Sequence, residues 1–79
     1  MDGTIYYVLL HEEQWTIKLR DKHYGPYRSQ QAAIEDAIEA ARQLGKTNPG
    51  GAQVLVQVEG DRFNIEWTYG QDAYPPPLH

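Results

Sequence analysis

The stretch QVLVQVEGDRFNIEWT, residues 53–68, decides the fold of this chain. Apolar side chains alternate with other residues on both sides of Gly60-Asp61, which is the pattern of a β-hairpin with a two-residue turn. With that turn the expected pairs are Glu59 with Arg62, Val58 with Phe63, Val56 with Ile65, and Val54 with Trp67. All six apolar side chains then share one face, and a slip of one residue would divide them between two faces.

The size and composition of the chain limit the classes of protein that it can form. Its 79 residues suit one small domain with a single thin core, and 41% hydrophobic with 23% charged residues is typical of a folded globular protein. The absence of cysteine excludes disulfides and thiolate metal sites. Because the longest apolar run, residues 5–10, is too short to span a bilayer and the N-terminus does not resemble a signal peptide, we expect a cytoplasmic protein.

The N-terminal segment predicts a second hairpin. Residues 5–10 are rich in strand-forming side chains, and Trp15, Ile17 and Leu19 alternate with polar residues. A short connection through Glu12-Glu13 gives the expected pairs Leu10 with Trp15, Val8 with Ile17, and Tyr6 with Leu19. These side chains are expected on the buried face.

One amphipathic helix lies between the two hairpins. After an expected loop over residues 21–28, Ser29 can cap a helix that ends at Gly45. Its apolar positions recur at steps of three and four residues and are Ala33, Ile34, Ala37, Ile38, Ala41 and Leu44. The three consecutive prolines near the C-terminus predict an extended tail over residues 70–79.

The order β-β-α-β-β predicts a single α+β domain over residues 1–79, with its ordered core at about residues 4–69. The simplest arrangement is a four-stranded antiparallel sheet with the helix on one face. Residues 5–10 are apolar on both sides, which suits an interior strand. We therefore predict the strand order 2-1-3-4, with the first and third strands antiparallel at the centre.

Several short motifs together resemble a known bacterial family. They are the strand residues 14–18 (QWTIK), the alanine-rich helix 32–42, the strand residues 54–58 before Gly60-Asp61, and Tyr69-Gly70 followed by Asp72 and Pro75. The chain is similar to domain of unknown function family 2188, whose small proteins end in a YG-DP-P motif, and the resemblance covers about residues 7–77. Ala73 and the longer loop 46–52 depart from the family pattern. The resemblance implies this fold and a bacterial or phage origin, and it names no reaction.

The sequence shows no pattern typical of catalysis. Ser29 is explained as a helix cap, and His11, His23 and His79 lack the spacing of a metal site. The acidic residues occur in adjacent or turn-spanning pairs without the apolar surroundings that would raise a catalytic pKa. We therefore expect no enzyme activity, no metal and no cofactor.

The sheet face that the single helix leaves open is the main candidate for binding. Ile5, Tyr7, Leu9 and Leu55 are expected to form an apolar strip there, with basic residues at its rim. The candidate binding residues are Tyr7, Leu9, Leu55, Lys18, Arg20 and Arg62. The strip is expected to bind a protein partner or a second copy of this chain, which predicts an interaction module. The alternative is that the tail folds back and places Tyr74 and the prolines on the strip.

Other features leave further possibilities open. Residues 23–27 (HYGPY) either cover a small core or provide a binding loop, and residues 74–77 (YPPP) could be a polyproline ligand. The open face could also bind single-stranded nucleic acid if Tyr7 stacks on a base. The net charge of −4 and the acidic Glu59 and Glu66 oppose this role.

Overall fold

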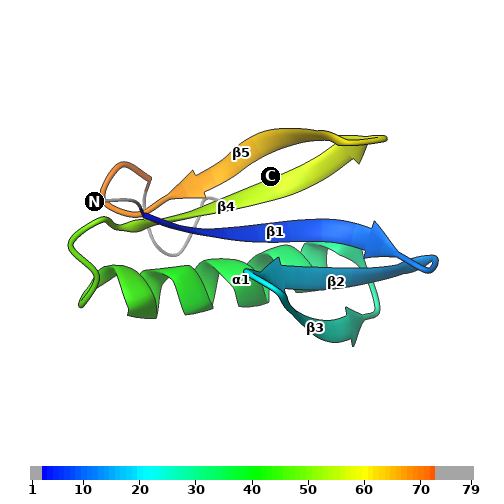
Figure 1. The fold of residues 1–79 in the computed structure, drawn as a ribbon, viewed down its shortest axis with the longest axis horizontal. Coiled ribbons are helices and arrows are strands. Elements are labelled where there is room, and N and C mark those ends of the chain that lie inside the picture. The colour runs from blue at the N-terminus through cyan, green and yellow to red at the C-terminus, as the bar shows by residue number, and fades with distance from the viewer. Residues whose placement is uncertain (1–2, 73–79) are drawn as a thin grey trace.

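The fold is one mixed five-stranded sheet with one helix packed across one of its faces (Figure 1). The computed structural model describes residues 3–72. Its elements are β1 (Thr4–His11), β2 (Gln14–Leu19), β3 (Lys22–Tyr27), α1 (Gln30–Gly45), β4 (Ala52–Glu59) and β5 (Arg62–Thr68). The strand order is β3-β2-β1-β4-β5. No helix within the described residues is long and apolar enough to cross a membrane.

The predicted four-stranded antiparallel sheet of order 2-1-3-4 is wrong, although the α+β class with one helix is confirmed. Part of the expected loop 21–28 is β3, which pairs antiparallel to β2 at the edge of the sheet. Because β3 crosses the sheet once more before the helix, α1 begins at one end of the sheet, whereas the prediction placed its start at the other end. The helix therefore returns in the opposite direction, and β4 runs parallel to β1, with Tyr6 opposite Val54.

The first hairpin has the predicted register. Tyr6 lies opposite Leu19, Val8 opposite Ile17, and Leu10 opposite Trp15. The turn residues Glu12 and Glu13 both have positive φ, 53° and 66°. Two positive φ angles are typical of the type I′ turns that connect antiparallel strands most tightly.

The second hairpin has the predicted turn but a different register between its ends. Glu59 lies opposite Arg62 and Val54 opposite Trp67, as expected. Two β-bulges intervene: the register shifts leave Val58 as an extra residue in β4 and Glu66 as an extra residue in β5. Phe63 therefore lies opposite Gln57, and Ile65 opposite Leu55, so the predicted pairs Val58/Phe63 and Val56/Ile65 are wrong.

The core lies between α1 and the sheet. The helix buries its predicted positions from Ala33 to Ala41, while Leu44 is only partly buried. The sheet contributes Tyr6, Val8, Ile17, Ala52, Val54, Val56 and Trp67. Ser29 caps the helix as predicted, since its hydroxyl oxygen accepts the N–H of Ala32 at 3.1 Å.

The end of α1 is fixed by the turn that follows β5. An ideal Cβ on Gly45 would lie 2.4 Å from Cγ of Tyr69, so the ring occupies the space that a side chain would need. The capping residue is Lys46 in an ordinary right-handed conformation, which makes packing the reason for glycine at position 45. Residues 70–72 form a turn in which the Asp72 carboxylate accepts the N–H of Thr68 at 2.8 Å. The remainder of the predicted extended tail, 73–79, lies outside the described residues.

Candidate binding surface on the open sheet face

The sheet face opposite α1 carries a continuous set of apolar side chains. The pairs of Tyr7 with Leu55 and of Leu55 with Ile65 connect three neighbouring strands across this face. Its apolar members, here called the open-face strip, are Ile5, Tyr7, Leu9, Leu55, Phe63 and Ile65. Among residues 3–72, no helix or second sheet lies on this side. The predicted strip is therefore present, and it is larger than expected.

Two aromatic rings form the centre of the open-face strip. The ring centroids of Tyr7 and Phe63 lie 5.3 Å apart with an interplanar angle of 77°, which is the edge-to-face arrangement that aromatic pairs prefer. Ile65 beside them is 63% exposed, more than the other exposed large apolar side chains of the described chain. Sequence reasoning missed Phe63 and Ile65 because regular alternation assigns both to the core.

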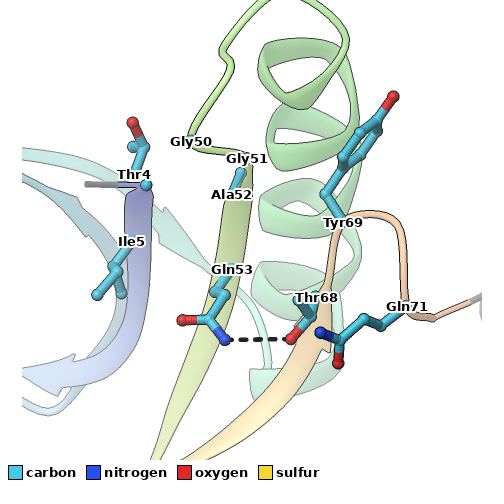
Figure 2. A pocket seen from close by; sticks show the side chains of 10 residues that line it. Thr4, Ile5, Gly50, Gly51, Ala52, Gln53, Thr68, Tyr69 and Gln71 are labelled. Atoms are coloured by element: carbon cyan, nitrogen blue, oxygen red, sulfur yellow. Dashed lines mark hydrogen bonds between the residues drawn. The ribbon is translucent and has the colours of Figure 1, made fainter. Parts of the chain in front are cut away.

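Polar side chains border the open-face strip along its length. Lys18 lies opposite Tyr7 and is half-buried. The side-chain amide of Gln57 accepts the N–H of Leu10 at 2.8 Å and also donates to the carbonyl of Gly60. Gln53 donates to the hydroxyl of Thr68 at 3.2 Å, a contact that Figure 2 shows between β4 and β5. This border surrounds the strip, whose central residues Tyr7 and Phe63 are half-buried.

Two of the predicted basic residues lie away from the strip. Arg20 is in the turn between β2 and β3 at φ 59°, and its charge acts on the phenol of Tyr6 on the helix-covered side. Burial nevertheless raises the pKa of Tyr6. Arg62 alternates with Phe63 along β5 and so leaves the open face, and its guanidinium lies 3.4 Å from a carboxylate oxygen of Glu59. Lys18 is therefore the predicted cation that stays beside Tyr7.

The edge strand β3 brings together two histidines that the sequence separates. The ring centroids of His11 and His23 are 5.0 Å apart, because His23 lies opposite Lys18 in β3 rather than in a loop. Nε2 of His11 lies 3.7 Å from a carboxylate oxygen of Glu12. No group of three or more potential ligands of the histidine, cysteine or carboxylate type that could hold a metal occurs among residues 3–72.

One hollow lies at the end of the sheet where β1 and β4 begin, and Figure 2 shows it from close by. Its volume is about 650 Å³ and its lining residues are Gly3, Thr4, Ile5, Gly50, Gly51, Ala52, Gln53, Thr68, Tyr69 and Gln71. Asn48 holds the adjoining loop, since its amide nitrogen donates to the hydroxyl of Thr4 at 3.2 Å and to the carbonyl of Gly51 at 3.0 Å. No carboxylate, histidine or lysine is among its described lining residues, so it offers no strong acid or base there.

The segment 23–27, predicted as either a core cover or a binding loop, is divided between two roles. The Tyr27 hydroxyl donates to the Asp36 carboxylate on α1, and its ring packs against the core. Burial, and then this hydrogen bond, raise the pKa of Tyr27 to about 12. Tyr24 is 46% exposed and borders a hollow of about 230 Å³ between β3 and α1.

These observations define a small α+β domain with an apolar open sheet face and, within residues 3–72, no group of three or more potential metal ligands. A family model described as "Uncharacterized protein conserved in bacteria (DUF2188)" matches residues 6–69. The chain belongs to this bacterial family, which confirms the resemblance. The match ends at residue 69, so the predicted extent to about residue 77, with Gly70 and the residues after it, lies outside the matched range. Searches of curated proteins and of solved structures found no match.

Proposed function

We propose that this protein is a non-enzymatic, cytoplasmic interaction module whose open-face strip binds a partner protein. The observation that carries the proposal is the extent of the strip, which spans β1, β4 and β5 and leaves Ile65 63% exposed. Exposed apolar side chains with a polar border are typical of protein contact surfaces. Lys18 beside Tyr7 favours a partner that places a carboxylate next to its own apolar side chains.

The aromatic pair gives the strip a suitable centre for binding. Tyr7 and Phe63 hold each other in an edge-to-face contact, so their rings lose little conformational freedom when a partner covers them. Large rigid side chains near the centre of a contact surface usually provide most of its binding free energy. The open-face strip therefore supports protein binding better than it supports catalysis.

Leu55→Lys is the variant that tests the proposal most directly. Leu55 lies between Tyr7 and Ile65, so a lysine places a charge at the apolar centre, while its long chain can reach solvent and leave the fold intact. A partner captured from bacterial lysate should be identified and then titrated against labelled protein by NMR. We expect shifts at Tyr7 and Phe63 and loss of binding in Leu55→Lys. Gln43→Lys on the exposed helix surface is the matched control.

Equal binding by Leu55→Lys and the native chain, or shifts confined to other surfaces, would refute the proposal. The same variant also tests whether the C-terminal tail covers the strip, a possibility that falls on residues outside the described ones. In that case Leu55→Lys and deletion of residues 75–79 should both lower the melting temperature. A melt that is unchanged by either variant removes the tail from consideration.

Binding of single-stranded nucleic acid is the second candidate function. The observation that favours it is the placement of Phe63 beside Tyr7, with Lys18 opposite Tyr7, because aromatic rings on an open sheet can stack on bases. The net charge of −4 opposes it. If this role holds, Leu55→Lys should strengthen oligonucleotide binding, and the affinity should fall steeply as salt rises.

A further inference from the structure

The two edges of the sheet differ in how well they are protected from pairing with another strand. β3 forms one edge and contains Pro26, which has no N–H to donate, and its register against β2 is irregular. β5 forms the other edge, as Figure 1 shows, and contains no proline. Its outward backbone groups have no strand beside them within residues 3–72. Among the described residues, the β5 edge is therefore the one open to a further strand.

The sequence of β5 complements itself when it is read in the opposite direction. If two copies of residues 62–66 (RFNIE) pair antiparallel about Asn64, each Arg62 lies opposite Glu66 of the other copy. Phe63 then lies opposite Ile65, and Asn64 opposite its own counterpart. Opposite charges and apolar pairs placed directly across neighbouring strands both stabilise a sheet.

We infer that two copies of this chain pair through their β5 edges about a two-fold axis at Asn64, which joins their sheets and makes the two open-face strips continuous. The pairing gives Phe63 and the exposed Ile65 apolar neighbours from the second copy. The existing contact of Arg62 with Glu59 does not compete, because both side chains are more than 70% exposed, at 74% and 78%, and such pairs contribute little. The paired segment ends at Glu66, where β5 bulges.

This inference concerns the strand edge and does not depend on the proposal for the open face. Leu55 lies on β4, one strand inside the edge, so Leu55→Lys tests the strip. Charge changes at Arg62 and Glu66 test the edge, because both residues are exposed and Arg62 points away from the strip. Failure of one proposal therefore leaves the other standing.

A charge-exchange experiment tests the pairing with the full chain. We expect the native chain to show a dimer fraction that rises with concentration in analytical ultracentrifugation. Arg62→Glu places two carboxylates opposite each other at both ends, and Glu66→Arg places two guanidinium groups there, so each variant alone should dimerise at least about tenfold more weakly. An equal mixture of the two variants restores both opposite-charge pairs, and native mass spectrometry should show a heterodimer.

Two controls separate this pairing from general effects of charge. The double variant with Arg62→Glu and Glu66→Arg keeps the net charge and should dimerise like the native chain. Glu35→Arg makes the same charge change as Glu66→Arg on the exposed side of α1 and should leave dimerisation unchanged. A native chain that stays monomeric at every concentration overturns the inference, and so does a mixture that gains no heterodimer while both variants melt as folded proteins.

Discussion

The contact between Gly45 and Tyr69 gives a prediction with an unusual sign. Alanine normally stabilises a helix relative to glycine by up to about 1 kcal/mol. At position 45, however, the new Cβ would lie 2.4 to 2.8 Å from three ring atoms of Tyr69, far inside van der Waals contact. The ring is held by its contact with Trp67, at 6.2 Å between centroids, and by the bond from the Tyr69 N–H to the carbonyl of Ala52 at 2.9 Å.

We expect Gly45→Ala to destabilise the protein by about 1–2 kcal/mol, because overpacking of this kind costs about 1–3 kcal/mol and the gain in helix propensity offsets part of it. In a domain of this size that change lowers the melting temperature by roughly 4–8 °C or more. Urea unfolding followed by circular dichroism measures the change in free energy, and a thermal melt followed in the same way measures the change in melting temperature. Lys46→Ala, one residue further on and exposed, is the neutral control.

The sign should reverse once the ring is removed. In a Tyr69→Ala background the new methyl group has room, so Gly45→Ala should then be neutral or stabilising by up to about 1 kcal/mol. The double-mutant cycle should give an interaction free energy of about 2 kcal/mol between the two positions. If Gly45→Ala raises the melting temperature of the native chain, the ring moves aside freely and the argument from packing fails.

Three further outcomes follow from the core, the second turn and the tyrosine at the edge. Trp67→Ala should lower the free energy of unfolding by about 3–5 kcal/mol in denaturant unfolding, because Trp67 is 2% exposed and its loss leaves a cavity under α1. A small change would contradict the placement of Trp67 opposite Val54. Gly60→Val should cost more stability than Asp61→Asn, since Gly60 has φ 55° and a β-branched residue resists that angle; equal costs would mean that the turn is not as described. The raised pKa of Tyr27 gives stability that is fully present below about pH 10, its ordinary pKa, and is lost as pH rises to about 12. Tyr27→Phe should therefore flatten this alkaline loss in melts from pH 9 to pH 12, whereas an unchanged slope would contradict the hydrogen bond between Tyr27 and Asp36.

Local sequence patterns predicted those parts of the fold in which pattern and turn chemistry act together. The register of the first hairpin, the cap at Ser29 and the buried helix positions all follow from short-range spacing. The strand β3 was missed because Gly25 and Pro26 normally mark a turn, and a proline is tolerated in a strand only at an edge. The number of strands before the helix decides at which end of the sheet the helix begins. Because β3 was missing from the prediction, β1 and β4 were predicted to be antiparallel, whereas they are parallel.

The candidate surface was predicted in part for a related reason. Tyr7, Leu9 and Leu55 follow from alternation along β1 and β4, and they lie on the open face as expected. Phe63 and Ile65 could not be placed from their spacing, because alternation contains no signal for a bulge. A bulge forms where a side chain makes better contacts on one face of the sheet than on the other. Those contacts exist only once the strands and the helix have assembled, so local spacing does not predict them.

The bulges have a physical cause in the limited reach of a single helix. At the end of the sheet near the second turn, α1 leaves the helix-side residues uncovered, since Val58 is 48% exposed and Leu10 is 47% exposed. A regular ladder would add Phe63 to this uncovered end, whereas the bulged ladder places it against Tyr7.

Ile65 gains no such partner within residues 3–72 and stays 63% exposed, although full burial of a side chain of this size is worth about 1.5–3 kcal/mol. The register that places Phe63 against Tyr7 therefore also leaves Ile65 at an apolar edge, and a second copy pairing at β5 would give it an apolar neighbour. The shape of the core and the proposed assembly then have one origin, a sheet that extends beyond the residues that its helix can cover.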